Sequence, residues 1–283
     1  EQLKDGVQKE AGVHTRDATE ADLLHLTELD LPKKRIVSLQ GLQHAVNLEF
    51  LVLRANEIAD ISELSGLTEM IYLDLRENSI EDIASLERLT QLEYLYLSEN
   101  RIHDVSSLKS MKKLYDLDLY NNELENIKAI AELDNLHYLD LGDNKIVDIS
   151  PLENLKDLYE LDLRFNKISN IDVISNLEKL NYLSLGWNSI TDISALKNLT
   201  NLETLSLTDN HISNIEPLRN LVNLDWLFLD YNDITRIDDL STLTELRSLD
   251  LSSNRISDIK PIEKLTNLIR LHLSDNESRI FRL

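Results

Sequence analysis

The chain has 283 residues, 42% hydrophobic and 28% charged, so it can bury a large core and is not disordered by composition. Its net charge of −22 argues against a nucleic-acid partner, because an acidic surface repels phosphate. It has no cysteine, which excludes disulfides and thiolate sites, and no apolar run long enough to span a membrane.

Residues 1–28 lack the repeat that fills the rest of the chain, and we expect them to form a helical N-terminal cap. Leu3, Val7 and Ala11 recur at helical spacing. Thr19 to Asp22 (TEAD) has the residues of a helix start with a capping box. The first ten residues lack the basic and then apolar profile of a signal peptide.

A 22-residue repeat starts at Leu29. A leucine recurs at this interval as far as Leu271, and another leucine follows two residues after each one. An asparagine lies five residues after the first leucine, from Asn56 to Asn276, and only Lys34 departs from this rule. The unit is LxLxxNxIxDIxxLxxLxxLxx, and its register never slips.

Each position of the unit predicts local structure. The LxL pair predicts a short strand with both leucines in the core. The asparagine lies where the chain leaves the strand, and its amide can pair backbone groups left free by the bend, so we expect a ladder of asparagines. The apolar residues spaced by three favour a 3₁₀ or extended segment. Pro151, Pro217 and Pro261 share one place in their repeats, typical of the first residue of a short helical turn.

This pattern resembles the leucine-rich repeat family, and specifically the 22-residue bacterial class typified by the internalins. The resemblance covers residues 29–276, eleven full turns and a partial one, with NxIxDI met at 56–61, 78–83, 144–149, 188–193 and 254–259. It implies an α/β solenoid: a leucine-rich repeat horseshoe with a parallel β-sheet on its concave side and 3₁₀ or extended segments on its convex side. The same pattern occurs in a cytoplasmic subclass of phosphatase regulators, so it leaves the compartment open.

Residues 277–283 depart from the repeat, and we expect a truncated C-terminal tail. Ile280, Phe281 and Leu283 either fold over Leu271 and Leu273 or belong to the next segment of a longer protein.

The side chains that point outward from the strands are not fixed by packing, so function is to be sought there. Nearly all the aromatic residues of the chain lie at these positions: Phe50, Tyr72, Tyr94, Tyr96, Tyr120, Tyr138, Phe165, Tyr182, Trp187, Trp226, Phe228 and Tyr231. Aromatic side chains gathered on one face are typical of a protein-binding surface. The alternative is the ordinary preference of strands for aromatic residues.

Acidic residues share this face. Asp118, Asp140 and Asp162 occupy the same place in three consecutive repeats. Neighbouring strands lie about 4.8 Å apart, so we expect repulsion and at least one raised pKa. Asp116, Asp143 and Glu160 add to the cluster, and Arg164 partly offsets it. The row fits a partner with a basic patch; the alternatives are a solvated acidic stripe and a shared calcium ion, for which the chain has no DxDxDG loop.

The sequence gives no indication of an enzyme. Its histidines lack metal-ligand spacing, and there is no Gly-rich phosphate loop or GxSxG elbow. We therefore expect no catalytic residue, metal site or cofactor. His137, which we expect close to Tyr115 and Asp116, is interpreted as a solvated histidine. Gly142 and Gly186 on the concave face predict dips that suit a knob from a partner.

The leading hypothesis is a monomeric protein-binding module of a bacterial cell-surface or secreted protein, without membrane insertion. By resemblance to internalins the partner is a host protein, which would make the chain a virulence factor. Capture of a host nutrient protein by a larger multidomain surface protein is equally compatible. The alternatives are a cytoplasmic scaffold that regulates an enzyme such as a phosphatase, and a structural spacer. The predicted binding residues are Tyr72, Tyr94, Tyr96, Asp116, Asp118, Tyr120, Tyr138, Asp140, Asp143, Glu160, Asp162, Arg164, Phe165, Tyr182, Trp187, Trp226, Phe228, Asp230 and Tyr231.

Overall fold

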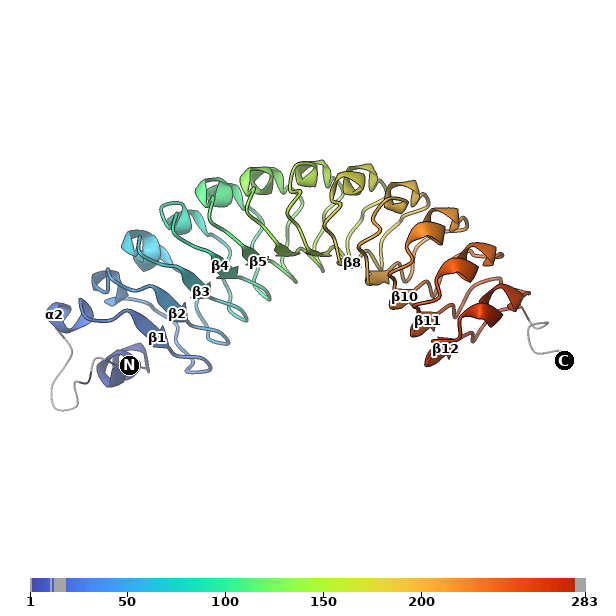
Figure 1. The fold of residues 1–283 in the computed structure, drawn as a ribbon. Coiled ribbons are helices and arrows are strands. Elements are labelled where there is room, and N and C mark those ends of the chain that lie inside the picture. The colour runs from blue at the N-terminus through green and yellow to red at the C-terminus, as the bar shows by residue number, and fades with distance from the viewer. Residues whose placement is uncertain (1, 11, 13–18, 278–283) are drawn as a thin grey trace. The chain divides into compact units, whose positions relative to one another are not determined.

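The structure is a computed structural model that describes residues 2–10, 12 and 19–277. The chain forms two compact units, Glu1–Asp140 and Leu141–Leu283, which we call the first and second unit. In both units short strands line one side of each coil and 3₁₀ helices the other (Figure 1). The leucine-rich repeat solenoid predicted from the sequence is confirmed.

The first unit begins with two helices, α1 (Gln2–Glu10) and α2 (Glu20–Leu23). Its strands are β1 (Glu28–Asp30), β2 (Phe50–Val52), β3 (Tyr72–Asp74), β4 (Tyr94–Tyr96), β5 (Asp116–Asp118) and β6 (Tyr138–Asp140). Its 3₁₀ helices are η1 (Leu42–His44), η2 (Ser62–Gly66), η3 (Ala84–Leu86), η4 (Ser106–Ser110) and η5 (Lys128–Glu132).

The second unit repeats the same plan. Its strands are β7 (Glu160–Asp162), β8 (Tyr182–Ser184), β9 (Thr204–Ser206), β10 (Trp226–Phe228), β11 (Ser248–Asp250) and β12 (Arg270–His272). Its 3₁₀ helices are η6 (Ser150–Leu152), η7 (Asp172–Asn176), η8 (Ser194–Leu196), η9 (Glu216–Asn220), η10 (Asp238–Thr242) and η11 (Lys260–Lys264).

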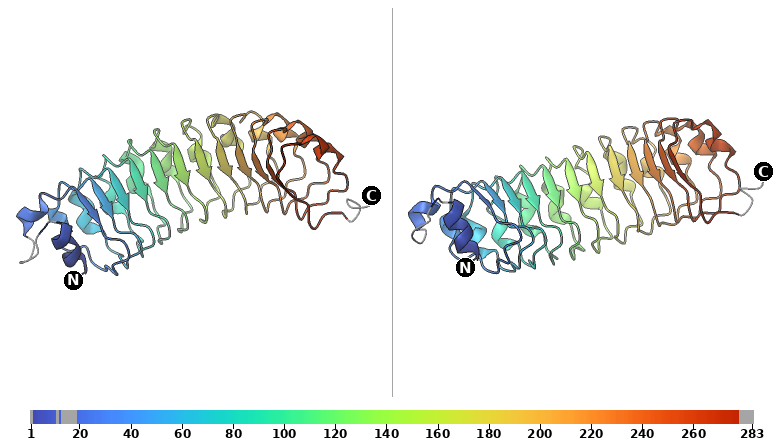
Figure 2. Two further views of the ribbon diagram at one scale, coloured as in Figure 1. Left: turned by 60° about the horizontal axis from the view of Figure 1, so that its bottom comes forward. Right: turned by 90° about the horizontal axis from the view of Figure 1, so that it is seen from below.

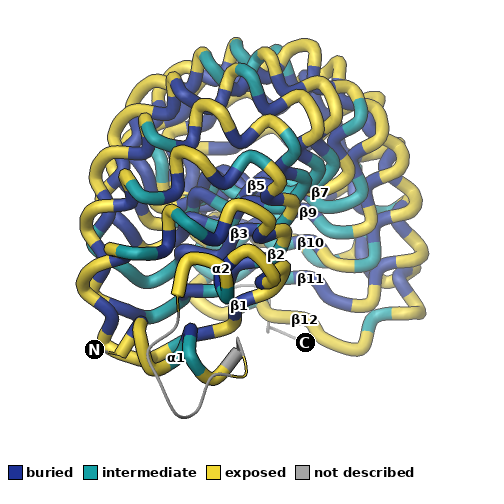
Figure 3. The backbone as a smooth tube through the Cα atoms, turned by 90° about the vertical axis from the view of Figure 1, so that its left-hand side faces the viewer, coloured by how far each residue is buried: buried dark blue, intermediate teal, exposed yellow. Residues whose placement is uncertain are grey.

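Within each unit the strands pair in parallel and in register, one repeat length apart (Figure 2). Leu95 pairs with Leu117 in the first unit, and Leu183 pairs with Leu205 in the second. All four side chains are fully buried. Buried positions lie inside the coils and exposed positions on their outer turns (Figure 3). The LxL pairs therefore fix which residues of each strand face outward.

An asparagine ladder closes each coil, as the repeat predicts. The Asn100 side chain donates to the carbonyl groups of Leu75 and Leu97, both at 3.0 Å, and accepts from the Ile80 amide at 3.0 Å. Asn188 makes the same contacts in the second unit, with the Leu163 carbonyl at 3.0 Å. Each asparagine thus pairs buried backbone groups of two successive coils, which would otherwise cost roughly 1–3 kcal/mol each.

A hydrogen bond repeated within the coils explains the aspartate of the NxIxDI motif, to which sequence reasoning gave no role. Its carboxylate accepts the backbone N–H at the start of the 3₁₀ helix, as in Ser62 N–H to Asp60 Oδ1 at 2.9 Å. Asn170 does the same with Asp172 N–H at 2.8 Å. These side chains cap short helices whose first donors have no other partner. Pro151 lies in the first turn of η6, as predicted, because proline needs no partner there.

The N-terminal helices pack on the first repeat. Leu3 and Val7 of α1 are buried, and a Cβ added to Gly6 would lie 2.4 Å from a methyl group of Leu31. Thr19 N–H donates to the Asp22 carboxylate at 2.7 Å at the start of α2. The division into cap, repeats and tail stays a prediction, and Ala11, Ile280, Phe281 and Leu283 lie outside the described residues.

Candidate functional site

The candidate site is the outward surface of the strands and of the two residues that follow each LxL pair, which we call the strand face of each unit. One backbone feature recurs on it. The residue before each ladder asparagine, from Ala55 to Asp275, is left-handed, with φ between 50° and 57°. This conformation costs an ordinary L-residue roughly 1–2 kcal/mol, and asparagine and aspartate tolerate it best.

Aromatic rings form a continuous chain across the first strand face. The rings of Phe50 and Tyr72 stack with centres 4.3 Å apart, and Tyr72 lies 5.4 Å from Tyr96. Further along, Tyr115 contacts Tyr138 at 5.4 Å. All five rings belong to half-buried residues, and none of them is exposed. This chain of contacts holds the rings in place before any partner arrives.

Hydrogen bonds hold the carboxylates of the same face. Tyr96 Oη donates to Asp116 Oδ2 at 2.8 Å, and the Arg76 guanidinium lies 5.0 Å from the centre of the Tyr96 ring. Ser98 Oγ donates to Asp118 at 2.7 Å, and the Tyr120 N–H donates to it at 3.0 Å. Burial raises the pKa of Asp116, with the bond from Tyr96 opposing the rise and the charge of Asp118 adding to it.

The predicted acidic row has residues in both units. Asp118 and Asp140 lie side by side in the first unit, where β5 and β6 pair. Asp162 lies in the second unit and is only 8% exposed. It accepts the Arg164 N–H at 2.9 Å and lies 3.2 Å from the Arg164 side chain. Its pKa is raised as predicted, but the main cause is burial and not repulsion between neighbouring carboxylates.

The second strand face exposes its aromatic side chains. Phe165, Trp187 and Tyr231 are 40%, 41% and 59% exposed, and each has the left-handed backbone conformation. Phe165 and Trp187 stack with ring centres 4.3 Å apart and planes 13° apart. Trp226, on β10, is also exposed, and its ring lies 6.3 Å from that of Phe228. The second face therefore presents accessible rings, three of them at strained positions.

The remaining predicted residues fall on both faces. Tyr94, Tyr120, Tyr138 and Asp140 are half-buried on the first unit. On the second unit, Asp143 and Glu160 are exposed and Tyr182 is half-buried. Asp230 accepts from Thr208 Oγ1 at 2.8 Å, and burial is the main cause that raises its pKa.

The predicted dip at Gly186 is a close approach of backbones, because a Cβ there would lie 3.2 Å from the Thr208 carbonyl oxygen. His137 is only half-buried, and its ring stacks on Tyr115 with centres 4.4 Å apart. The predicted closeness of these two residues is therefore confirmed.

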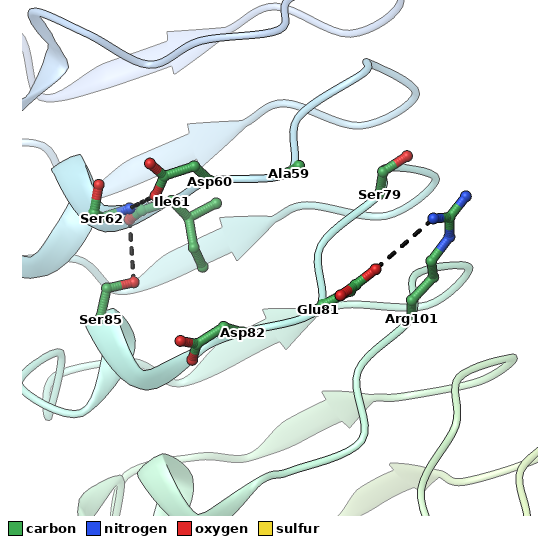
Figure 4. Close-up of a pocket in the computed structure, with 9 residues that line it drawn as sticks. All are labelled: Ala59, Asp60, Ile61, Ser62, Ser79, Glu81, Asp82, Ser85 and Arg101. Atoms are coloured by element: carbon green, nitrogen blue, oxygen red, sulfur yellow. Dashed lines mark hydrogen bonds and ion pairs between the residues drawn. The ribbon is translucent and has the colours of Figure 1, made fainter.

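A hollow of about 570 Å³ lies on the flank of the first unit, away from the strand face (Figure 4). Its polar side chains already serve the scaffold. Asp60 caps η2, Ser85 Oγ donates to the Ile61 carbonyl at 3.1 Å, and Arg101 lies 3.8 Å from Glu81. We therefore do not assign a ligand to it.

Two classes of site find no support in the described part of the chain. Within residues 2–10, 12 and 19–277, no group of three histidine or carboxylate side chains is placed to hold a metal ion. Over the same residues, no helix combines the length and the apolar composition needed to cross a membrane.

Sequence reasoning missed two features of the second face. One is the left-handed backbone under its exposed rings, which the position before the asparagine signals in every repeat. The other is a pocket of about 140 Å³ lined by Trp226, Arg247, Ser248, Ile269 and Arg270. Trp226, Ser248 and Arg270 occupy the same strand position in successive repeats. Tyr72 and Tyr182 occupy this position in other repeats and were among the predicted binding residues.

Models of leucine-rich repeats match most of the chain. The model described as leucine-rich repeats in two copies matches residues 90–132, 134–178, 175–220, 222–259 and 244–280. The model described as leucine-rich repeat matches residues 60–102. A comparison with curated proteins finds no match.

Solved structures similar to the chain include an internalin, InlF, from Listeria monocytogenes, at 36% identity and a TM-score of 0.95, over 98% of this chain and 82% of that one. Internalin C2 of the same species is 28% identical, with a TM-score of 0.52, over 96% and 92%. The ectodomain of the Arabidopsis thaliana receptor kinase GASSHO1/SCHENGEN3, in complex with CASPARIAN STRIP INTEGRITY FACTOR 2, is 25% identical, with a TM-score of 0.69, over 88% and 35%.

Coils, ladders and strand faces together define a protein-binding module built from leucine-rich repeats. The chain belongs to the leucine-rich repeat family, with repeats of the internalin type.

Proposed function

We propose that the chain is the binding module of a bacterial cell-surface or secreted protein and grips another protein through its strand faces. The likeness to internalins supports the bacterial surface. A host protein is the partner that this likeness favours. The partner is bound without chemistry, by surface complementarity alone.

The observation that carries the proposal is the set of exposed rings on left-handed backbone. Phe165, Trp187 and Tyr231 occupy positions that other repeats fill with residues such as Asn121 and Asp209. A large ring there adds backbone strain and leaves apolar surface in water, so scaffold stability alone does not favour it. Burial of the ring by a partner recovers the cost, and aromatic side chains often dominate binding energy in this way.

The first strand face contributes through charge. Asp116 and Asp118 are held by Tyr96 and Ser98, so their carboxylates are oriented in advance. A lysine or arginine of a partner can neutralise them and relieve the cost of keeping them half-buried. The net charge of −22 also steers a basic partner toward the protein. The proposed partner therefore has both an apolar surface and a basic patch.

A pull-down with matched baits tests the proposal. One bait is the wild type, one is Trp187→Asn with Tyr231→Asn, and a control bait carries Val147→Asn with Val222→Asn. The control residues are 57% and 46% exposed and lie outside the strand face of the same unit, so it removes similar apolar surface elsewhere.

We expect a protein from host-cell extract or serum that the wild type and the control bait retain and the strand-face variant loses. Its affinity for the variant should be about tenfold weaker or more, as for loss of central aromatic contacts. No specific capture by any bait would leave the chain a structural spacer, and equal capture by all three would contradict binding through these strand-face rings. In a parallel pull-down from bacterial lysate, capture of a cytoplasmic enzyme with none from host material would favour the regulatory scaffold.

A further inference from the structure

A small pocket near the end of the second unit differs in charge from the rest of the strand face. Its lining residues are Trp226, Arg247, Ser248, Ile269 and Arg270, and its volume is about 140 Å³. We call it the Trp226 pocket. Trp226, Ser248 and Arg270 lie side by side, because β10, β11 and β12 pair in register.

The small middle residue shapes this pocket. Ser248 is buried and short, so Arg270 can lie across it toward the indole of Trp226. The Arg270 guanidinium carbon is 5.8 Å from the centre of the Trp226 ring. A cation over an aromatic face is held in place by the ring's negative face while its edge N–H groups stay open. The stacked guanidinium is therefore oriented but not saturated.

Arg270 also differs from the other strand-face arginines in its partners. Arg54, Arg76 and Arg164 each pair with a carboxylate of their own unit. Arg247, which lines the same pocket, is held by two bonds to Asp225, at 2.8 and 2.6 Å. Among the described residues, no carboxylate forms an ion pair with Arg270. In a chain of net charge −22, this cation lacks the partner that its neighbours have.

Apolar surface borders this cation. Ile269 is 77% exposed and Trp226 is 40% exposed, and both line the pocket. Leaving isoleucine and tryptophan side chains in water is unfavourable, by about 25 cal/mol for each Å² of apolar surface. An occupant that suits the pocket therefore carries a carboxylate for Arg270 and an apolar group for Ile269 and Trp226.

We propose that the Trp226 pocket takes an acidic side chain, aspartate or glutamate, from an extended segment of the protein partner. The carboxylate pairs with the open N–H groups of Arg270, and an apolar residue next to it in the segment covers Trp226 and Ile269. Charge complementarity selects this occupant, since a guanidinium presents parallel N–H groups to a carboxylate. The inference deepens the proposed protein-binding function and adds an acidic anchor to a partner that is otherwise basic.

Two short peptides test the pocket without the partner. The probes are acetyl-Leu-Glu-Leu-amide and its glutamine counterpart, acetyl-Leu-Gln-Leu-amide. The leucine-rich repeat chain used for these titrations carries Trp187→Phe, which leaves Trp226 as its sole tryptophan. The indole N–H signal of Trp226 in NMR spectra then reports on the pocket alone. Titrations give a dissociation constant for each peptide. Two further variants in this background are Arg270→Gln and, as a matched control, Arg255→Gln, whose arginine is exposed and pairs with Asp233 at 2.7 Å.

We expect the glutamate peptide to bind about fivefold or more tightly than the glutamine peptide, as for a charge-assisted hydrogen bond. Arg270→Gln should abolish this preference, and Arg255→Gln should keep it. Equal affinities, a preference that survives Arg270→Gln, or no shift of the Trp226 signal would each overturn the inference. Because the partner takes no part, these outcomes are independent of the pull-down with Trp187 and Tyr231 variants.

Discussion

The two strand faces are built on the same scaffold but hold their aromatic side chains differently. In the first unit the rings lie half-covered in a chain of contacts, and Tyr96 is bonded to Asp116. In the second unit Trp187 and Tyr231 stand exposed on left-handed backbone. The first unit resembles a charged surface made rigid in advance, and the second a set of accessible anchors. We infer that the first unit contributes orientation and charge, and the second most of the apolar binding energy.

The largest expected effect tests what the two units share. Asn100→Ala and Asn188→Ala each leave several buried backbone groups without partners, which costs roughly 1–3 kcal/mol per group. We expect both variants to lose about 3 kcal/mol of unfolding free energy in urea titrations. Asn198→Ala, at an exposed site outside the ladder, should change it by less than about 0.5 kcal/mol. Very unequal losses at Asn100 and Asn188 would show that the two scaffolds are not equivalent.

A smaller effect tests the strained positions of the second unit. At Tyr231, where φ is 54°, glycine should be about 1 kcal/mol more stable than alanine, because only glycine adopts this backbone without penalty. At Tyr94, in the extended strand β4, the order should reverse, with alanine more stable by about 0.5–1 kcal/mol. Both pairs lose the ring, so the comparison isolates the backbone. Thermal unfolding of the four variants measures these differences in stability. A Tyr231→Ala variant more stable than Tyr231→Gly would show that the backbone at this position is not strained.

The smallest effect concerns the half-buried carboxylate of Asp116 in the first unit. Burial raises the pKa of Asp116, so the folded state binds its proton more tightly than the unfolded state does. The contribution of this group to stability is therefore fully present below its ordinary pKa near 3.8, where the carboxyl is protonated in both states. It falls as the pH rises from the ordinary value near 3.8 through the raised folded value.

Asp116→Asn should consequently be more stable than wild type at pH 7, while its amide oxygen can still accept from Tyr96. The difference should shrink as the pH falls and the wild-type carboxyl is protonated. Urea titrations from pH 3 to pH 7 check this. A wild type that is more stable than Asp116→Asn at neutral pH would show that Tyr96 and Arg76 outweigh burial.

Much of the fold could be predicted from the sequence, because the repeat imposes one register on every coil. The burial of the strand leucines, such as Leu95 and Leu183, and the asparagine ladder follow directly from the spacing of these residues. The outward position of Asp118 follows from alternation within β5. Trp187 lies beyond β8 on left-handed backbone, so alternation does not predict its outward position. Side-chain contacts along the stack are a different matter, since they depend on rotamers and on neighbours 22 residues away in the sequence.

These side-chain contacts determine which outward positions are exposed, and the sequence alone did not predict them. Spacing placed Asp162 in an exposed row, but its bonds with Arg164 and its burial remove it from the surface. Spacing also gave no hint that Arg270 reaches past Ser248 to Trp226. The left-handed backbone at Tyr231 could have been inferred, because Asn121 and Asp209 at the same repeat position are the residues that tolerate it best.

The central claim is that the two units bind one partner by different physics. The direct measurement is the affinity of the captured partner for two variants, at about 0.05 and 0.5 M salt. One is Asp118→Asn with Asp140→Asn in the first unit, where asparagine can still accept the Tyr120 N–H. The other is Trp187→Asn with Tyr231→Asn in the second unit.

We predict that the first-unit variant binds about tenfold more weakly at low salt and approaches wild type at high salt, because salt screens exposed charges. The second-unit variant should lose about tenfold at both salt concentrations, because apolar burial is not screened. Wild-type affinity for the second-unit variant, or the same salt dependence for both variants, would contradict the account.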